Sequence, residues 1–180
     1  MDIGGASTLG VAVVGVVGTL MSALLTQRAA DGGRRREQER AEEVAERRRR
    51  ERELCACYVG LNAAARQYLA ALTDQVHALG RDADLPAARQ RLAEARDQYR
   101  AVYAEAQLRV PERVLDLAGP FSHDLGELYG MIRRLDAGVP RAGDSPAAVQ
   151  EGIDARWAGL RRMRGEMRAQ LGVSRADSGR

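Results

Sequence analysis

The sequence predicts an all-α protein in which an N-terminal transmembrane helix and a charged helical stalk precede an antiparallel up-down-up-down four-helix bundle. Three observations predict this fold class. Residues 3–26 contain no charged side chain, and residues 34–53 carry sixteen charges in twenty positions. From Leu54 onward, apolar residues recur every three or four positions, and no run of β-branched residues has the period of two that marks a strand. The expected parts are a transmembrane anchor at 1–27, a juxtamembrane hinge and charged stalk at 28–53, the bundle at 54–172 and a disordered tail at 173–180.

The apolar N-terminal segment is long enough to cross a bilayer. At about 1.5 Å per residue, residues 3–26 extend about 36 Å as a helix, which exceeds the hydrocarbon thickness of about 30 Å. A secretory signal peptide is the alternative. It would begin with basic residues, whereas this chain begins Met1-Asp2, and the following "LLTQRAAD" offers a poor cleavage site. We therefore interpret the segment as an uncleaved anchor.

The flanking charges predict the orientation of this anchor in the cell membrane. No arginine precedes it, whereas Arg28, Arg34, Arg35 and Arg36 follow it closely. The positive-inside rule then places the N-terminus outside and the rest of the chain, after residue 27, in the cytoplasm, as a single-pass protein. The same four arginines are candidate contacts for anionic lipid headgroups, each adding on the order of 1 kcal/mol of attraction.

Small residues recur at helical spacing along one face of the predicted anchor. They are Ala6, Gly10, Gly18 and Ser22. Such a face lets two transmembrane helices approach closely, so these residues are candidate contacts between two copies of the chain in a homodimer. The alternative is that Gly and Ala are simply abundant throughout this sequence.

The charged segment after the anchor is interpreted as a solvated helical stalk. Gly32 and Gly33 predict a joint, because adjacent glycines disfavour a continuous helix. From residue 34 to residue 53 no Gly or Pro occurs, and acidic residues precede arginines by four positions. A coiled coil is only weakly encoded, because charged residues share the register of Ala41 and Val44. A disordered charged linker is the alternative. We expect the stalk, about 30 Å long, to continue into the first bundle helix.

Four amphipathic segments predict the bundle, and the short connections between them favour antiparallel neighbours. Gly80, Pro111 and Gly172 are expected helix ends, Pro120 an expected kink or local break, and Asp84 and Ser145 or Asp144 expected N-caps. The predicted core positions are Leu54, Tyr58, Leu61, Ala65, Tyr68, Leu72, Val76 and Leu79; Leu85, Ala88, Leu92, Ala95, Tyr99, Val102 and Ala106; Val114, Leu117, Phe121, Leu125, Leu128, Ile132 and Leu135; and Val149, Ile153, Trp157, Leu160, Met163, Met167 and Leu171.

No catalytic motif, cofactor-binding motif or metal-ligand spacing is visible in the sequence. Cys55 and Cys57 lie two apart, so on a helix they point about 200° from one another and are interpreted as structural residues. A redox or metal-binding role is the alternative. The one candidate for a pocket is "GPFSHDLGE", because a helix kinked at its proline could aim His123, Asp124 and Glu127 into a cleft. The more ordinary interpretation is that His123 faces solvent.

The balance of basic and acidic residues bears on whether the chain binds nucleic acid. The 28 basic residues are all arginine and stand against 25 acidic residues, for a formal net charge of +3. Acidic residues are interspersed with the arginines and leave no uniformly basic block longer than four residues, which argues against nucleic acid as a partner. Because no lysine occurs at all, a coding bias toward GC-rich codons explains the arginines better than a function does.

The segment "RRRRERELCACYVGLNAAARQYLAAL", placed between an anchor and a helical domain, resembles short actinobacterial single-pass membrane proteins of unknown function. That resemblance implies a high-GC bacterial source and no known activity. The layout is also similar to that of the b subunit of bacterial ATP synthase, but the Pro and Gly breaks depart from its long uninterrupted helix. The sequence therefore predicts a membrane-tethered bundle without catalytic activity, which binds an unknown protein partner or itself. The alternatives are an enzyme or ligand sensor with a pocket near His123 and a membrane-linked DNA-tethering protein.

Overall fold

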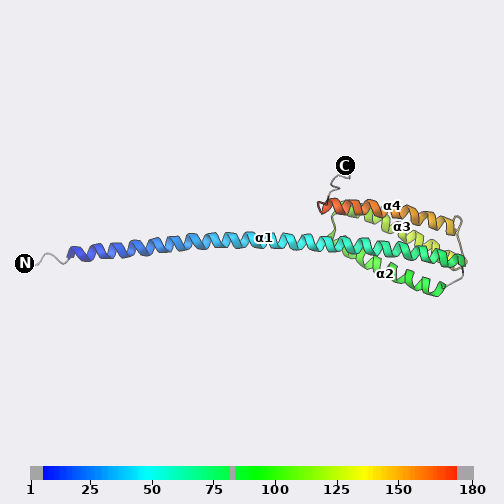
Figure 1. Cartoon of the computed structure of the whole chain (residues 1–180), viewed down its shortest axis with the longest axis horizontal. Helices are drawn as coiled ribbons and strands as arrows, with labels where there is room; N and C mark the ends of the chain where they lie inside the picture. Colours follow the sequence, from blue (N-terminus) through cyan, green and yellow to red (C-terminus); the bar gives the residue numbers. More distant parts are fainter. Residues whose placement is uncertain (1–5, 82–83, 174–180) are drawn as a thin grey trace, which may run out of the picture. The chain divides into compact units, whose positions relative to one another are not determined.

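The computed structural model describes the backbone of residues 6–81 and 84–173, with side chains from residue 37 onward. Four helices make up the described chain: α1 (Ala6–Arg81), α2 (Leu85–Arg109), α3 (Glu112–Asp136) and α4 (Pro146–Gln170) (Figure 1). No strand occurs within these ranges, so the all-α prediction is confirmed. The chain divides into two compact units, Met1–Arg50 and Glu51–Arg180.

Helix α1 is continuous from Ala6 through the charged segment into the bundle. It includes Gly32 and Gly33, at which the sequence predicts a joint. A glycine in a helix costs only about 1 kcal/mol relative to alanine, and the strong helix formers on both sides can offset that cost. Within the part of the chain whose side chains are described, no helix is long and apolar enough to cross a membrane. The anchor predicted at residues 1–27 lies outside that part.

The second unit is a packed assembly of the C-terminal part of α1 with α2, α3 and α4. Figure 1 shows these helices lying side by side and running in alternating directions. The connections are short, as antiparallel neighbours require: only residues 82–84, 110–111 and 137–145 separate consecutive helices. Each helix contributes side chains to one shared apolar core. Its most deeply buried large side chains include Leu61, Leu69, Leu72, Tyr99, Leu125, Ile132, Ile153 and Met163.

Most of the predicted core positions are buried, and one is wrong. Leu117 is 38% exposed, whereas Ala118 next to it is fully buried. Val114, Ala118, Phe121 and Leu125 follow a 4-3-4 spacing, which keeps all four on the face of α3 that points into the core. Leu117 lies about 100° around the helix from Ala118 and therefore reaches the surface.

The helix ends agree with the sequence in part. Ser145 caps α4, because its Oγ accepts a hydrogen bond of 3.1 Å from the Ala148 amide. Asp84 stands at the N-cap of α2 with φ of 57°, but its side chain makes no capping hydrogen bond. Helix α1 extends one residue past Gly80. Helix α3 passes through Pro120 without the predicted break, because burial of flanking residues such as Phe121 compensates for one missing backbone hydrogen bond.

Tyr99 connects three helices at the centre of the bundle. Its ring centroid lies 5.7 Å from that of Tyr68 on α1, 5.9 Å from that of Tyr103 on α2 and 6.4 Å from that of Phe121 on α3. The contact with Phe121 is edge-to-face and the one with Tyr103 is stacked, and both arrangements are favourable for aromatic pairs. Burial raises the pKa of the Tyr68 and Tyr99 hydroxyls, which therefore stay protonated.

Glycines bring α3 and α4 close together. A Cβ added at Gly152 would lie 2.5 Å from Cδ2 of Leu128, and one added at Gly159 would lie 3.4 Å from Cδ2 of Phe121. The two glycines are seven residues apart on α4, and Phe121 and Leu128 are seven residues apart on α3. Two glycines on one face of α4 therefore accommodate two large side chains of α3. This close packing fixes the register of the two helices that carry the candidate pocket residues.

Candidate functional site

The three predicted pocket residues do not converge. His123 and Glu127 lie one turn apart on the outer side of α3, where Nε2 of His123 is 3.4 Å from Oε1 of Glu127. Both side chains are mostly exposed, at 74% and 67%. Asp124 instead points toward α4, where its Oδ2 lies 3.0 Å from Nε of Arg156. Adjacent residues on a helix point about 100° apart, so His123 and Asp124 serve different surfaces.

The His123 side of α3 forms an open groove rather than an enclosed pocket. Its lining includes Gly126 and Gly130 of α3, together with Arg134 and Arg141. Below the groove, Phe121, Leu125 and Leu128 are buried in the core. A histidine exposed this far keeps its hydration shell, and the groove beside it is open to solvent.

A second hollow, which the sequence did not predict, lies between α3 and α4. It has a volume of about 140 Å³. Gly159 and Ala155 on α4 leave the space open, Leu117, Pro120 and Phe121 supply apolar walls, and two carboxylates and two guanidinium groups complete the lining: Asp116, Asp124, Arg156 and Arg162. No histidine, cysteine or serine lines this cleft. These three side chains, which commonly act as nucleophiles or bases, are therefore absent from its lining. Sequence reasoning missed it because it depends on which small residues of α4 face which residues of α3.

Two bidentate ion pairs tie the helix ends together. Nε and Nη2 of Arg89 on α2 each lie 2.8 Å from a carboxylate oxygen of Asp136 at the end of α3. Arg134 holds Asp144 in the α3–α4 loop at 2.6 and 2.9 Å, and the Arg141 amide donates a third hydrogen bond to the Asp144 carboxylate. The Arg134 guanidinium, followed by the Arg141 amide, lowers the pKa of Asp144 to about 2. These ion pairs hold α2, α3 and the α3–α4 loop together, and Arg134 and Arg141 also line the groove beside His123.

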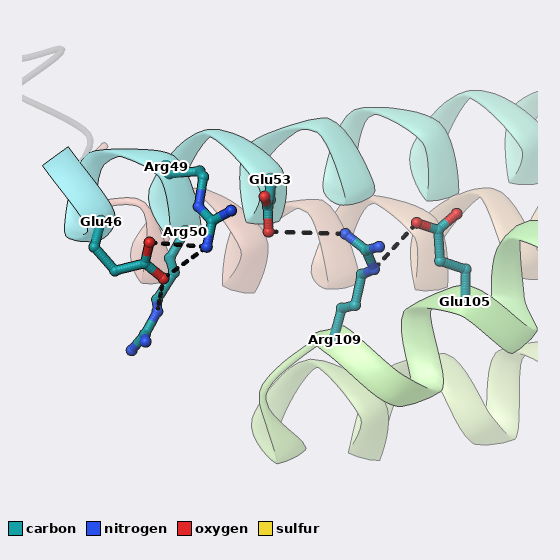
Figure 2. Close-up of polar contacts among 6 residues, drawn as sticks. All are labelled: Glu46, Arg49, Arg50, Glu53, Glu105 and Arg109. Carbon is teal, nitrogen blue, oxygen red and sulfur yellow. Dashed lines mark hydrogen bonds and ion pairs between the residues drawn. The ribbon is translucent and has the colours of Figure 1, made fainter.

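The polar contacts near residue 50 of α1 are ion pairs within one helix, together with one pair between α1 and α2 (Figure 2). Glu46 accepts hydrogen bonds of 3.0 Å from both Arg49 and Arg50, which lowers its pKa. In the bundle, Arg109 of α2 lies 3.2 Å from Glu105 of its own helix and 4.0 Å from Glu53 of α1. All of these side chains are at least 39% exposed, so the ion pairs remain accessible to water and salt.

The two cysteines occupy different environments. Cys55 is exposed, whereas Cys57 is buried, and both are free thiols. Burial, with a smaller contribution from Glu105, raises the pKa of the Cys57 thiol, which disfavours the reactive thiolate. Across residues 37–81 and 84–173, no group of three or more His, Cys, Asp or Glu side chains is placed to hold a metal ion.

The predicted membrane contacts lie outside the described side chains. They are the small residues Ala6, Gly10, Gly18 and Ser22 and the arginines Arg28, Arg34, Arg35 and Arg36. Their backbone belongs to α1. Comparison of the chain with protein-family models, with characterised proteins and with solved structures finds no significant match.

Proposed function

We propose that this chain is a membrane-tethered, cytoplasm-facing helical bundle that acts by binding another protein or a second copy of itself, without catalytic activity. In this proposal residues 1–27 span the cell membrane once with the N-terminus outside, residues 28–53 form the spacer, and the bundle is the binding domain. The observation that carries it is the contrast between the uncharged residues 3–26 and the arginine-rich segment that follows them.

The interior of the bundle supports a binding role. Apolar side chains of all four helices fill the shared core, and the titratable side chains singled out from the sequence point to separate surfaces. An interaction domain needs such a rigid scaffold with an exposed recognition surface, whereas catalysis needs converging groups in a site that excludes water. The alternative enzyme or sensor role would require a pocket that joins His123 with Asp124, and these two side chains diverge.

Topology mapping tests the tether. We expect a reporter fused after Arg180 to lie in the cytoplasm, and the full chain to sediment with membranes and resist extraction by high salt. Cleavage of the bundle by a protease added outside intact cells would contradict the orientation, and a soluble chain shortened at its N-terminus would contradict the anchor.

Affinity purification of the full chain from detergent-solubilised membranes tests the interaction. We expect a stoichiometric partner or a defined oligomer after chemical crosslinking. If the chain, purified at its native expression level, is a monomer without a partner, that result would count against a binding function.

A further inference from the structure

One exposed face of α4 combines the chain's single tryptophan with three arginines. Trp157, Arg161, Arg164 and Arg168 follow 4-3-4 spacing, so their positions fall within about 60° of one another around the helix and form a straight strip about 16 Å long. The three arginines are exposed, and Trp157 packs against the core with part of its side chain accessible. We call this set the α4 strip.

Within the described part of the chain, the three arginines of the α4 strip are exposed cations without an ion-pair partner, a property they share with bundle arginines such as Arg133 but combine with a shared row beside Trp157. Arg89, Arg109, Arg134 and Arg156 each lie within 4.0 Å of a carboxylate. Among residues 37–81 and 84–173, no ion pair joins Arg161, Arg164 or Arg168 to a carboxylate. Arg168 in the last turn is favourable to the helix dipole, but Arg161 lies too far from the end for that to be its main role.

We propose that the α4 strip is a docking surface for an acidic helix of a partner protein. Tryptophan and arginine are the residue types most enriched among the energetically dominant residues of protein interfaces. A facing helix presents side chains at the same three- and four-residue spacing, so carboxylates at positions i, i+3 and i+7 can meet the three guanidinium groups. An apolar side chain one turn further along would cover the exposed part of Trp157.

The composition of the rest of α4 favours a narrow acidic helix over a broad polyanion. Glu151 and Glu166 lie on the same helix outside the strip and would repel a nucleic acid duplex or an anionic lipid surface that covers more than one row of side chains. Asp154 continues the row one turn before Trp157, so the acidic stretch of a facing helix must begin beyond Trp157. Asp154 and Glu166 accept hydrogen bonds only from glutamines, Gln150 and Gln170, so their charges are not neutralised by those contacts.

The chain contains its own reporter and its own matched control. Trp157 is the only tryptophan, so its fluorescence reads events at the strip directly. Arg162 is exposed, lies on the same helix and faces the cleft shared with α3, so Arg162→Glu makes the same charge change away from the strip. The inference rests on the proposed function, because it names the partner chemistry of the same bundle.

The test uses the full chain in neutral detergent and an alanine-rich helical peptide with one leucine followed by glutamates 4, 7 and 11 positions later. We expect saturable, salt-sensitive quenching or a shift of Trp157 emission. Arg164→Glu should weaken binding by at least about tenfold, and Arg162→Glu by no more than about twofold. The double variant Arg161→Ala/Arg168→Ala should also bind at least about tenfold more weakly, which guards against a misfolded Arg164→Glu protein.

Three outcomes would overturn the inference. One is the absence of a saturable response to the glutamate peptide, and another is equal weakening by Arg162→Glu and Arg164→Glu. The third is a response to vesicles of anionic phospholipid or to duplex DNA but not to the peptide. Affinity purification separates this failure from that of the proposed function. If wild type and Arg164→Glu recover the same partner equally, the proposed function stands and the docking role of the α4 strip is contradicted.

Discussion

Helix α1 contains two stretches that are helical for different reasons. Between residues 37 and 50 its side chains are exposed, except that of Glu46, which is half-buried. Between residues 51 and 81 the same helix buries a continuous face that includes Leu61, Leu69 and Leu72. In the first stretch, ion pairs such as that between Glu46 and Arg50 stabilise the helix from within, whereas in the second, burial in the apolar core shared by the four helices does.

The two stretches should therefore differ in how substitutions and salt change their stability. A buried leucine contributes about 1.5–3 kcal/mol through burial, and that contribution is insensitive to salt. Exposed charge pairs contribute much less and weaken as ionic strength rises. Substitutions in the bundle should therefore change the free energy of unfolding strongly, whereas substitutions in residues 37–50 should act weakly, locally and in a salt-dependent way.

The largest expected effect is that of Tyr99→Ala, which removes the ring that connects α1, α2 and α3. Loss of a buried aromatic side chain should lower the free energy of unfolding by about 3–5 kcal/mol. The matched change in the exposed stretch is Val44→Ala, at a valine that is 49% exposed, and it should alter that free energy by less than about 0.5 kcal/mol. Urea unfolding followed by Trp157 fluorescence measures both. Similar values for the two variants would contradict the comparison.

The next largest effect concerns the close approach of α3 and α4. Gly152→Ala places a Cβ against buried Leu128 and should cost about 1–3 kcal/mol. Gly165→Ala, where an added Cβ meets nothing within 4 Å, should instead stabilise the protein by up to about 1 kcal/mol through helix propensity. The same urea titration gives both values. If both variants were stabilising, Leu128 would be free to move and the contact would not fix the helix register.

The sequence predicted most of this core because burial follows helical period. Tyr58, Leu72, Tyr99 and Ile132 lie in unambiguous rows and are all buried. Leu117 was misassigned because Leu117 and Ala118 both fit a spacing of three or four from Val114, and hydrophobicity alone favours the leucine. The glycine contacts of α4 could not be predicted, since they require knowing which residues of α3 lie opposite.

The candidate site was predicted less well than the core. His123, Asp124 and Glu127 were grouped because a helix kinked at Pro120 could aim them into one cleft, although neighbours on a helix point to different surfaces. Helical geometry alone could have separated them. The 4-3-4 spacing of the α4 strip can be read from the sequence, but the exposure of its three arginines and the partial burial of Trp157 could not, because both depend on how α4 packs against the other helices.

A smaller and pH-dependent effect is expected at Asp144, where the bundle uses charge as well as packing. Its pKa is lowered to about 2 when folded, against about 3.9 when unfolded, so the carboxylate contributes stability above pH 4 that is lost as the pH falls toward 2. Asp144→Asn should lower the melting temperature at pH 7 by less than Tyr99→Ala or Gly152→Ala does. The melting temperature of the variant should also fall less between pH 4 and pH 2 than that of the wild type. Melting curves across that range test this, and an unchanged acid slope in the variant would contradict it.

The smallest expected effect lies in the exposed stretch, where Glu46→Gln removes the negative charge that pairs with Arg49 and Arg50. Backbone amides around residues 43–50 should exchange faster with deuterium at low salt, because the helix opens locally more often when the pairs are lost. The difference should vanish near 1 M salt, where the Debye length is about 3 Å. Glu37→Gln removes one charge from the same stretch about two and a half turns away and should leave exchange at those amides unchanged. Hydrogen exchange of the full chain measures these rates, and acceleration that persists in high salt would mean that packing, not charge, stabilises this part of α1.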